Sequence, residues 1–349
     1  MSSAAVVVIM MLFTLSVRAV DAPKFLKNYI IEEIENLHFD SQFEFGRVEI
    51  GLSENFNPKI IVSDVTIYNN LDSLPFLEIS KLELGASLRQ ITTGNFNLST
   101  ILLDGLTIGI SRDVAGYYSI KFGQSILLTN ESDNIFSPAS MSLRKFFERE
   151  AFLDLENFTV TSMTVQYDDQ KESKLWVIDG ARIELSKQLD DVFVRGDAAF
   201  LMGGAEISML QVNYETNLKS GDGSVGILFE GFPSKEIAAQ APALSWLNVV
   251  EAPISGAFRT QVGSEMEVNE INASLKIGSG VIRADDKSKP LRFDNANVYL
   301  SYNRKINLLN FEEITINSTD LQTILAGSCL LYTSPSPRDA TLSRMPSSA

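Results

Sequence analysis

KIIVSDVTIY (residues 59–68) and FLEISKLELGASL (residues 76–88) are the two runs that decide the fold class of this chain. Both alternate apolar and polar residues, and Asn69-Asn70 lies between them. Successive side chains of a strand point to opposite faces, so a period of two predicts β-strands, and paired Asn residues favour a turn. The two runs therefore predict neighbouring strands joined by a turn.

The second run changes phase half-way along. Leu77 and Ile79 alternate with polar residues, whereas Leu82 and Leu84 continue the alternation in the opposite phase. A shift of one residue moves every later side chain to the other face of a sheet unless an irregularity restores it. We therefore expect a bulge or a turn near Ser80-Lys81.

The same alternation recurs along the chain. Short strands without long helices between them predict an antiparallel, mainly β architecture. Two helices are expected to interrupt it: Met141–Phe152, charged on one side and aromatic on the other, and Ser234–Leu247, broken at Pro242. The further strand candidates are Ile101–Ile110, Phe158–Tyr167, Leu175–Leu185, Val192–Phe200, Glu206–Tyr214, Ser224–Phe229, Ile271–Ile277, Asn295–Tyr302 and Phe311–Ile316.

The N-terminal end is apolar. Ala4–Val17 carries no charged residue and precedes Arg18. As a helix this run spans about 21 Å, against about 30 Å for the hydrocarbon core of a bilayer. A membrane anchor that has lost its start is the favoured interpretation, and a signal-peptide core or a buried strand or helix stays open. Lys24–Leu37 follows with apolar residues at helical spacing and predicts a short amphipathic helix beside the membrane.

The C-terminal end differs from the rest of the chain. Residues 329–349 read CLLYTSPSPRDATLSRMPSSA, with Cys329, the single cysteine of the chain, and no hydrophobic alternation. The stretch resembles translated adapter or vector sequence, and such segments are set aside in fold reasoning. The alternative is a Ser/Pro-rich disordered tail.

The composition of the chain argues against several classes of function. The chain has 349 residues, and 29 Lys and Arg against 44 Asp and Glu give a net charge of −15. Binding phosphates requires clustered Lys and Arg, so the acid excess argues against a nucleic-acid partner. One His and one Cys argue against zinc, haem, iron–sulfur and thiol enzymes. We expect no catalytic residue, no metal and no cofactor, and therefore no enzymatic activity.

Motifs that could carry chemistry are weak. Gly221–Gly226 matches GxGxxG, but a strand-like run follows it where a dinucleotide site needs a helix, so a turn is favoured. The acidic pairs Asp168-Asp169, Asp190-Asp191 and Asp285-Asp286 lack calcium-loop spacing and are interpreted as solvated turns. His38, between Leu37 and Phe39, is interpreted as a packing or surface residue.

The order of these segments resembles a known family. A strand with NPKIIVSDVTIYN precedes a second strand, a short Gly-containing link and LSTILLDGLTIGISRDVAGYYSI. Farther along, the helix and strand start of Gly231–Thr260 and the segment Leu291–Ser318 continue the pattern. Over roughly residues 20–327 the chain resembles AsmA-like proteins, and more closely their YhdP branch. The positions that match the family's strand motif are Leu103, Gly105, Arg112, Asp113 and Gly116, and farther on Pro253, Ser255 and Gly256.

The resemblance implies a function. AsmA-like proteins are similar to bridge-like lipid-transfer proteins, in which stacked strands form an apolar groove. The implied protein is anchored in the inner membrane of a Gram-negative bacterium by a single pass, with its bulk in the periplasm. It would carry phospholipid acyl chains between the inner and outer membranes, and contact an outer-membrane or envelope partner through a C-terminal part beyond this chain.

The expected organisation follows from the family. Residues 1–19 would be a membrane anchor or signal segment, and residues 20–130 an N-terminal AsmA-like β region with a juxtamembrane helix. Residues 131–327 would continue as YhdP-like β-groove repeats with two short helices, and residues 328–349 would be a non-native tail. The expected fold is an elongated, twisted antiparallel β-sheet or groove with a few short helices, preceded by an N-terminal membrane helix.

Alternate strand positions are the candidates for the groove face. Charged substitutions there, such as Leu84→Asp and Ile108→Asp, would abolish lipid occupancy while the fold survives. Two other functions stay open: a lipid-free scaffold that assists outer-membrane biogenesis, and a secreted carbohydrate-binding β-sandwich, for which the chain offers only Trp176 and Trp246 as aromatic platforms of that size. The groove candidates are Leu82, Leu84, Leu106, Ile108, Ile183, Leu275 and Val298.

Overall fold

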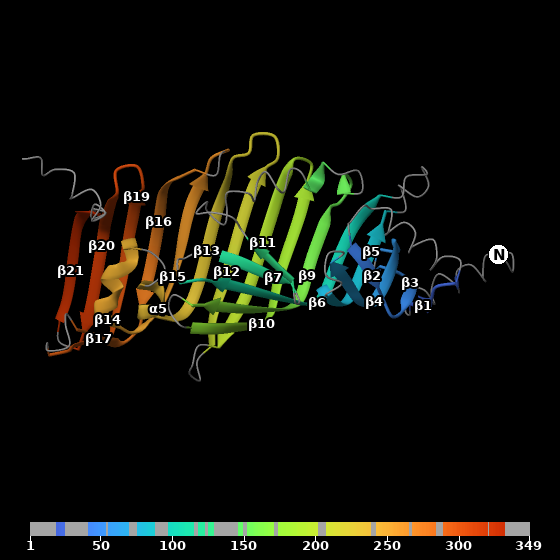
Figure 1. The fold of residues 1–349 in the computed structure, drawn as a ribbon. Coiled ribbons are helices and arrows are strands. Elements are labelled where there is room, and N and C mark those ends of the chain that lie inside the picture. Colours follow the sequence, from blue (N-terminus) through green and yellow to red (C-terminus); the bar gives the residue numbers. More distant parts are fainter. Residues whose placement is uncertain are drawn as a thin grey trace, which may run out of the picture. The chain divides into compact units, whose positions relative to one another are not determined.

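The computed structural model is mainly β (Figure 1). It divides into two compact units. Unit 1 comprises Met1–Glu230 and Val262–Glu267, and unit 2 comprises Gly231–Gln261 and Val268–Ala349. The structure describes residues 19–24, 41–53, 55–69, 75–87, 97–114, 118–122, 125–128, 146–148, 152–170, 174–201, 207–238, 242–264, 267–283, 289–319 and 321–331.

The sheet of unit 1 is built from consecutive strands. β1 pairs with β3, β2 and β3 pair with different stretches of β4, and the ladder continues through β5, β6, β9, β10, β11 and β12 to β13. β7 pairs with the second half of β6, and β8 pairs with β7. The strands are β1 Val20–Asp21, β2 Ser41–Glu44, β3 Val48–Leu52, β4 Pro58–Asn69, β5 Pro75–Ala86, β6 Leu98–Arg112, β7 Tyr118–Phe122, β8 Ser125–Leu128, β9 Asn157–Asp169, β10 Lys174–Gln188, β11 Asp191–Leu201, β12 Ile207–Asn217 and β13 Gly223–Pro233.

One pairing of unit 1 is parallel. Thr100 of β6 lies opposite Asn157 of β9, and Arg112 lies opposite Asp169. The expectation of an antiparallel sheet is wrong for this pair, although every other pairing named above is antiparallel. A parallel pair requires a long crossover connection, and β7 and β8 lie within the connection between β6 and β9. Alternation of apolar residues is the same in both directions, so the sequence pattern does not distinguish them.

A line of backbone irregularities, which we call the crease, crosses several strands of unit 1. Backbone φ is positive at Asp64 of β4, Gly105 of β6, Ser162 of β9 and Gly180 of β10. On each strand the crease separates two buried or half-buried apolar residues spaced by three positions instead of two. The pairs are Val62 and Val65, Ile79 and Leu82, Leu103 and Leu106, Val160 and Met163, and Ile178 and Ala181.

The crease explains the phase change near Ser80-Lys81. One residue in the left-handed region adds a step to the strand, so the apolar residues on either side of it return to the same face. β5 itself has no positive φ at Ser80, but Ser80 lies beside Gly105, where a Cβ atom would clash with the Ser80 hydroxyl oxygen. The expected irregularity is therefore present, and it is shared by the neighbouring strands.

Unit 2 combines a strand ladder with a small sheet and a helical segment. β16, β19, β20 and β21 pair in that order, all antiparallel, and β14, β17 and β18 form the small sheet. The elements are α5 Ser234–Ala238, the 3₁₀ helix η2 Pro242–Val249, β14 Val250–Glu251, β15 Pro253–Val262, β16 Val268–Ile277, β17 Gly280–Ile282, β18 Leu291–Phe293, β19 Asn295–Asn303, β20 Leu308–Ser318 and β21 Leu321–Leu330.

The helical segment of unit 2 confirms the helix expected at Ser234–Leu247 and its break at Pro242, where η2 begins. The indole ring of Trp246 packs edge-on against Phe311 of β20, with ring centroids 5.5 Å apart. Phe311 lies opposite Leu300 on β19, so η2 covers the face that carries the core residues Val298 and Leu300. The core of unit 2 lies between this face and η2.

Several expectations fall outside the described residues. The apolar run Ala4–Val17, the helix expected at Lys24–Leu37 apart from Lys24, and His38 lie there, as does the expected domain boundary at residue 130. Of the helix expected at Met141–Phe152, Phe146 and Phe147 are described and helical. β21 includes Cys329 and Leu330, which pair with Leu309 and Leu308 of β20, so these two residues continue a strand of unit 2.

Candidate functional site

The inner face of unit 1 is the candidate site. We define it as the face of the sheet that carries the apolar residues beside the crease and their same-face neighbours on the adjoining strands. Residues of β4, β5, β6, β9 and β10 form one packed cluster there, which includes Val62, Leu106 and Val160. Because successive side chains alternate between faces, one face of each strand supplies all of these residues.

A second packed cluster covers one end of the inner face. It contains Ile101 of β6, Leu185 of β10 and Val192 of β11, together with Phe147 and Leu155 from the segment before β9. The aromatic side expected for Met141–Phe152 is thus found on the sheet, at Phe147. This end of the face is closed by the chain's own side chains.

The inner face continues in a less buried form over β11, β12 and β13. Val194, Tyr214 and Val225 form one cross-strand row, and Gly196, Val212 and Ile227 form the next. All of these residues are partly accessible, whereas Val62 and Val160 are buried. A third row contains Ala198, Leu210 and the buried Phe229. We call these three rows the open rows.

The opposite, outer face of the same strands carries polar side chains together with apolar ones, among them Phe193, which is 37% exposed. Arg195 of β11 donates through Nε to Oδ1 of Asn213 of β12 at 3.5 Å, and Asp197 lies opposite Gln211. Exposed apolar side chains also occur on this face at one end of the strands, at Val177, Ile207, Met209 and Leu228. They are more accessible than the open rows, so both faces have to be compared in any binding experiment.

Charged side chains of the outer face pair near the crease. Lys59 Nζ lies 2.9 Å from Oε2 of Glu83, and Lys81 Nζ lies 3.0 Å from its Oε1. Partial burial raises the pKa of Glu83, but the hydrogen bonds from Lys59 and Lys81 outweigh it, so the pKa is lowered overall. Hydrogen bonds from Ser162 and Thr161 likewise lower the pKa of the Asp104 carboxyl. These groups stabilise the sheet in their ionised forms.

The candidate groove residues of the sequence all lie on buried faces. Leu106 belongs to the first packed cluster, beside the crease, and Leu82, Ile108 and Ile183 pack against that cluster. Leu84 packs against the second cluster. The structure therefore brings these positions together on the inner face of unit 1.

The remaining two candidates lie in unit 2. Leu275 and Val298 lie opposite each other on β16 and β19, with side chains 2% and 1% exposed. They share the face that η2 covers and are core residues of unit 2. Their assignment to a lipid groove stays a prediction, with no accessible surface at either position to support it.

The residues of the open rows are not among the groove candidates predicted from the sequence. Their strands were expected from the sequence, but alternation does not distinguish a packed stretch of an apolar face from an accessible one. One signal was present: Gly196 interrupts the apolar pattern of the inner face of β11, and such a small residue leaves room above a sheet.

Several of the dismissed motifs have structural roles, and Asp285-Asp286 lies outside the described residues. Gly221 lies in the turn between β12 and β13 with a φ of 79°, so the turn interpretation of Gly221–Gly226 is confirmed. The interpretation of Asp168-Asp169 as a solvated turn is wrong for Asp169, because it lies in β9 and is buried. It accepts a hydrogen bond from the Tyr167 hydroxyl at 3.2 Å and lies 3.4 Å from Arg112 Nη1. It therefore links β6 to β9. Asp190 pairs with Lys219 across neighbouring turns.

Two searches of the described residues give negative results. No helix in this part of the chain is long and apolar enough to cross a membrane. No group of three or more His, Cys, Asp and Glu side chains is arranged there to hold a metal ion.

Comparison of the chain with protein-family models, with curated proteins and with solved structures finds no match.

Proposed function

We propose that this chain is a non-enzymatic lipid-binding protein of the cell envelope, which shields phospholipid acyl chains on the inner face of unit 1 during transfer between the inner and outer membranes. The observation that supports this function is the set of open rows on β11, β12 and β13. Apart from the buried Phe229, their residues are partly accessible, and Val194 and Ala198 join them to the two packed clusters.

The energetic argument concerns the hydrocarbon chain. Each CH₂ group removed from water contributes about 0.8 kcal/mol, so an acyl chain gains from any apolar strip long enough to follow it. Within a row, side chains on adjacent strands repeat about every 4.8 Å, and they offer such a strip without a nucleophile, metal or cofactor.

The proposed location rests on the resemblance to AsmA-like proteins and on the apolar run Ala4–Val17. The N-terminal segment would anchor the chain in the inner membrane, with the described units in the periplasm. An outer-membrane or envelope partner would receive the lipid.

Adjacent residues of β13 provide the test. Ile227 faces inward in an open row, and Leu228 is 42% exposed on the outer face. A photoreactive amino acid is placed at one position or the other in the full chain, expressed in bacteria grown with radioactive phosphate. After illumination, we expect a labelled phospholipid adduct from position 227 and not from position 228.

The other outcomes reject the proposal. An adduct from position 228 alone would assign lipid to the outer face, and no adduct from either would favour a lipid-free scaffold. Ile227→Asp is preferred to Leu84→Asp and Ile108→Asp as a charge variant, because Leu84 and Ile108 pack against the core clusters and their charged variants are expected to unfold.

A further inference from the structure

Three phenylalanines of the segment before β9 form a compact group on the inner face. We call Phe146, Phe147 and Phe152 the aromatic wedge. The rings of Phe146 and Phe152 stack with centroids 4.5 Å apart, and Phe147 meets Phe146 edge-on at 5.3 Å. Phe146 also meets Phe158 of β9 edge-on at 6.3 Å. Aromatic pairs in these geometries stabilise each other beyond their buried area.

The wedge occupies apolar surface that continues into the open rows. Phe147 is 4% exposed and packs in the cluster that includes Leu185 and Val192, with Val194 at its margin. Val194 is also a member of the first open row, opposite Tyr214. The aromatic wedge and a ligand on the open rows would therefore meet at Val194.

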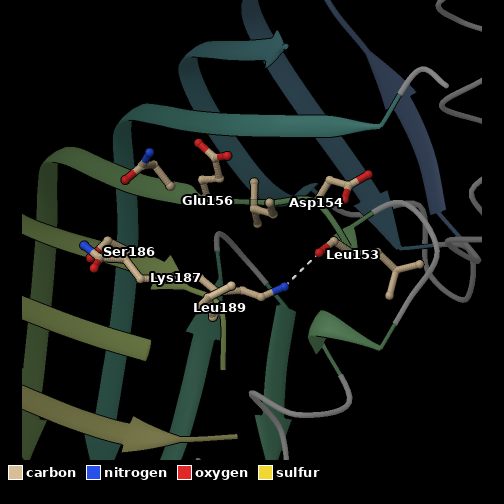
Figure 2. A pocket seen from close by; sticks show the side chains of 9 residues that line it. Leu153, Asp154, Glu156, Ser186, Lys187 and Leu189 are labelled. Atoms are coloured by element: carbon tan, nitrogen blue, oxygen red, sulfur yellow. Dashed lines mark hydrogen bonds between the residues drawn. The ribbon is translucent and has the colours of Figure 1, made fainter. Parts of the chain in front are cut away.

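Lys187 of β10 holds the wedge in place. Its Nζ donates a hydrogen bond to the carbonyl oxygen of Leu153 at 2.7 Å (Figure 2). The same Nζ lies 4.8 Å from the centre of the Phe147 ring. A cavity of about 530 Å³ lies here, lined by Leu153–Asn157 and by Ser186–Leu189. One ammonium group thus contacts both a ring of the wedge and the backbone that follows it.

The described backbone of the wedge takes no part in a strand ladder. Phe146 and Phe147 are in a helical turn, and Leu155 closes a local turn by donating its N–H to the Phe152 carbonyl at 3.2 Å. Ladder hydrogen bonds begin at β9, after Glu156 donates its N–H to the Ser99 carbonyl at 2.9 Å. Removing the wedge from the face would break ring contacts and the Lys187 bond, with the ladders of β9 and β10 intact.

We propose that the aromatic wedge is a displaceable stopper, which occupies the end of the inner face in place of an acyl chain and is latched by Lys187. The inference rests on the proposed function and adds a regulation of the same face. An acyl chain that extends from the open rows past Val194 displaces the wedge, and release of the latch makes that displacement easier.

The experiment uses the photoreactive amino acid at position 194 or 227 of the full chain, in three backgrounds. Lys187→Met removes the ammonium group and keeps the length of the side chain. Lys187→Arg retains the cation, and Lys219→Met is the matched control, because Lys219 is exposed and pairs with Asp190. We expect Lys187→Met to raise the yield of phospholipid adduct at position 194 about fivefold, with less than a twofold change at position 227.

The controls separate this inference from the proposed function. Lys187→Arg and Lys219→Met are expected to retain the wild-type yields, and the double variant Phe146→Ala/Phe147→Ala to resemble Lys187→Met. An adduct at position 227 with equal yields at position 194 in the wild type and Lys187→Met would overturn the stopper alone. No adduct at position 227 in any background would overturn the proposed function and the stopper with it.

Discussion

At the residue scale, single positions with unusual backbone conformations determine how the strands of unit 1 keep one apolar face. Gly105, Ser162 and Gly180 each have a positive φ on neighbouring strands, and the apolar pairs around them are spaced by three. Side chains other than Gly rarely adopt this region, at a cost of roughly 1–2 kcal/mol. Gly105 has a second constraint, because Ser80 occupies the space of its missing Cβ.

Gly105→Ala is therefore expected to be the most destabilising of three Gly→Ala substitutions in unit 1. We expect it to lower the free energy of unfolding by about 2–3 kcal/mol, from backbone strain plus the clash with Ser80. Gly180→Ala, with a φ of 72° and no atom within 4 Å of the new Cβ, is expected to cost about 1 kcal/mol. Urea denaturation followed by circular dichroism gives these values.

The control for that series is Gly226→Ala, which has open space around the Cβ and no positive φ. It is expected to leave stability unchanged or slightly higher. Equal effects of all three substitutions would contradict the role assigned to the crease.

The lowered pKa of Glu83 predicts a pH dependence at the same scale. In the unfolded chain a Glu side chain has a pKa of about 4.3. The pKa of Glu83 in the folded chain is lower, because Lys59 and Lys81 stabilise its ionised form. The unfolded chain takes up its proton first, so the stabilisation is present above about pH 4.3 and is lost as the pH falls through the folded pKa.

Glu83→Gln is accordingly expected to be less stable than the wild type at pH 7, with a difference that shrinks toward pH 3. Urea unfolding midpoints measured at intervals over that range test the trend. Glu215→Gln, at an exposed position of β12, serves as the comparison. A difference between wild type and Glu83→Gln that is constant with pH would show that the ion pairs do not contribute through ionisation.

At the element scale, β21 differs from the other strands of unit 2. Among the described residues it pairs with β20 alone, and Leu321, Ile324, Leu325 and Leu330 are exposed. A strand edge with unpaired backbone groups and apolar side chains is a template for pairing with another chain. The packed strands β16 and β19 carry their apolar residues in the core instead.

Ile324→Lys is expected to reduce self-association without lowering the melting temperature, because Ile324 is 65% exposed and adds little to the core. Static light scattering against protein concentration measures the effect. Gln322→Lys adds the same charge to the same strand and removes no apolar group. If Gln322→Lys reduces association equally, net charge and not the apolar edge is responsible.

At the scale of the whole molecule, the chain contains two compact units with separate apolar cores. Leu106 lies in the packed cluster beside the crease in unit 1. Leu275 of β16 is a core residue of unit 2 and lies opposite Val298 of β19. A different segment packs on the sheet in each unit: the aromatic wedge in unit 1 and the helical segment in unit 2. Both segments contain helical turns that pack on one face of a sheet.

Leu106→Ala and Leu275→Ala are expected to act on different units. Removing a buried Leu side chain costs about 2–5 kcal/mol, and the loss falls on the unit whose core contains the cavity. Hydrogen exchange measured by mass spectrometry should show faster exchange across β4–β10 for Leu106→Ala, and across β16–β20 for Leu275→Ala. Equal loss of protection in both units for either variant would show that they unfold together.

Much of the fold follows from local patterns in the sequence. Alternation located most of the long strands, Pro242 marked the break between α5 and η2, and the phase change near Ser80-Lys81 pointed to the crease. The candidate site was less accessible to this reasoning. Leu82 and Leu106 were placed on the correct buried face, but Val212 and Ile227, which stay partly accessible, were not singled out.

The sequence by itself determined that this chain is mainly β, because side-chain alternation and turn residues are properties of neighbouring residues. Only the tertiary structure decided that β6 and β9 run parallel, that Phe147 closes one end of the inner face and that Trp246 of η2 packs against Phe311. The physical reason is that strand direction, register and burial depend on contacts between residues distant in sequence. A periodic pattern records that a face is apolar, and the fold determines what covers it.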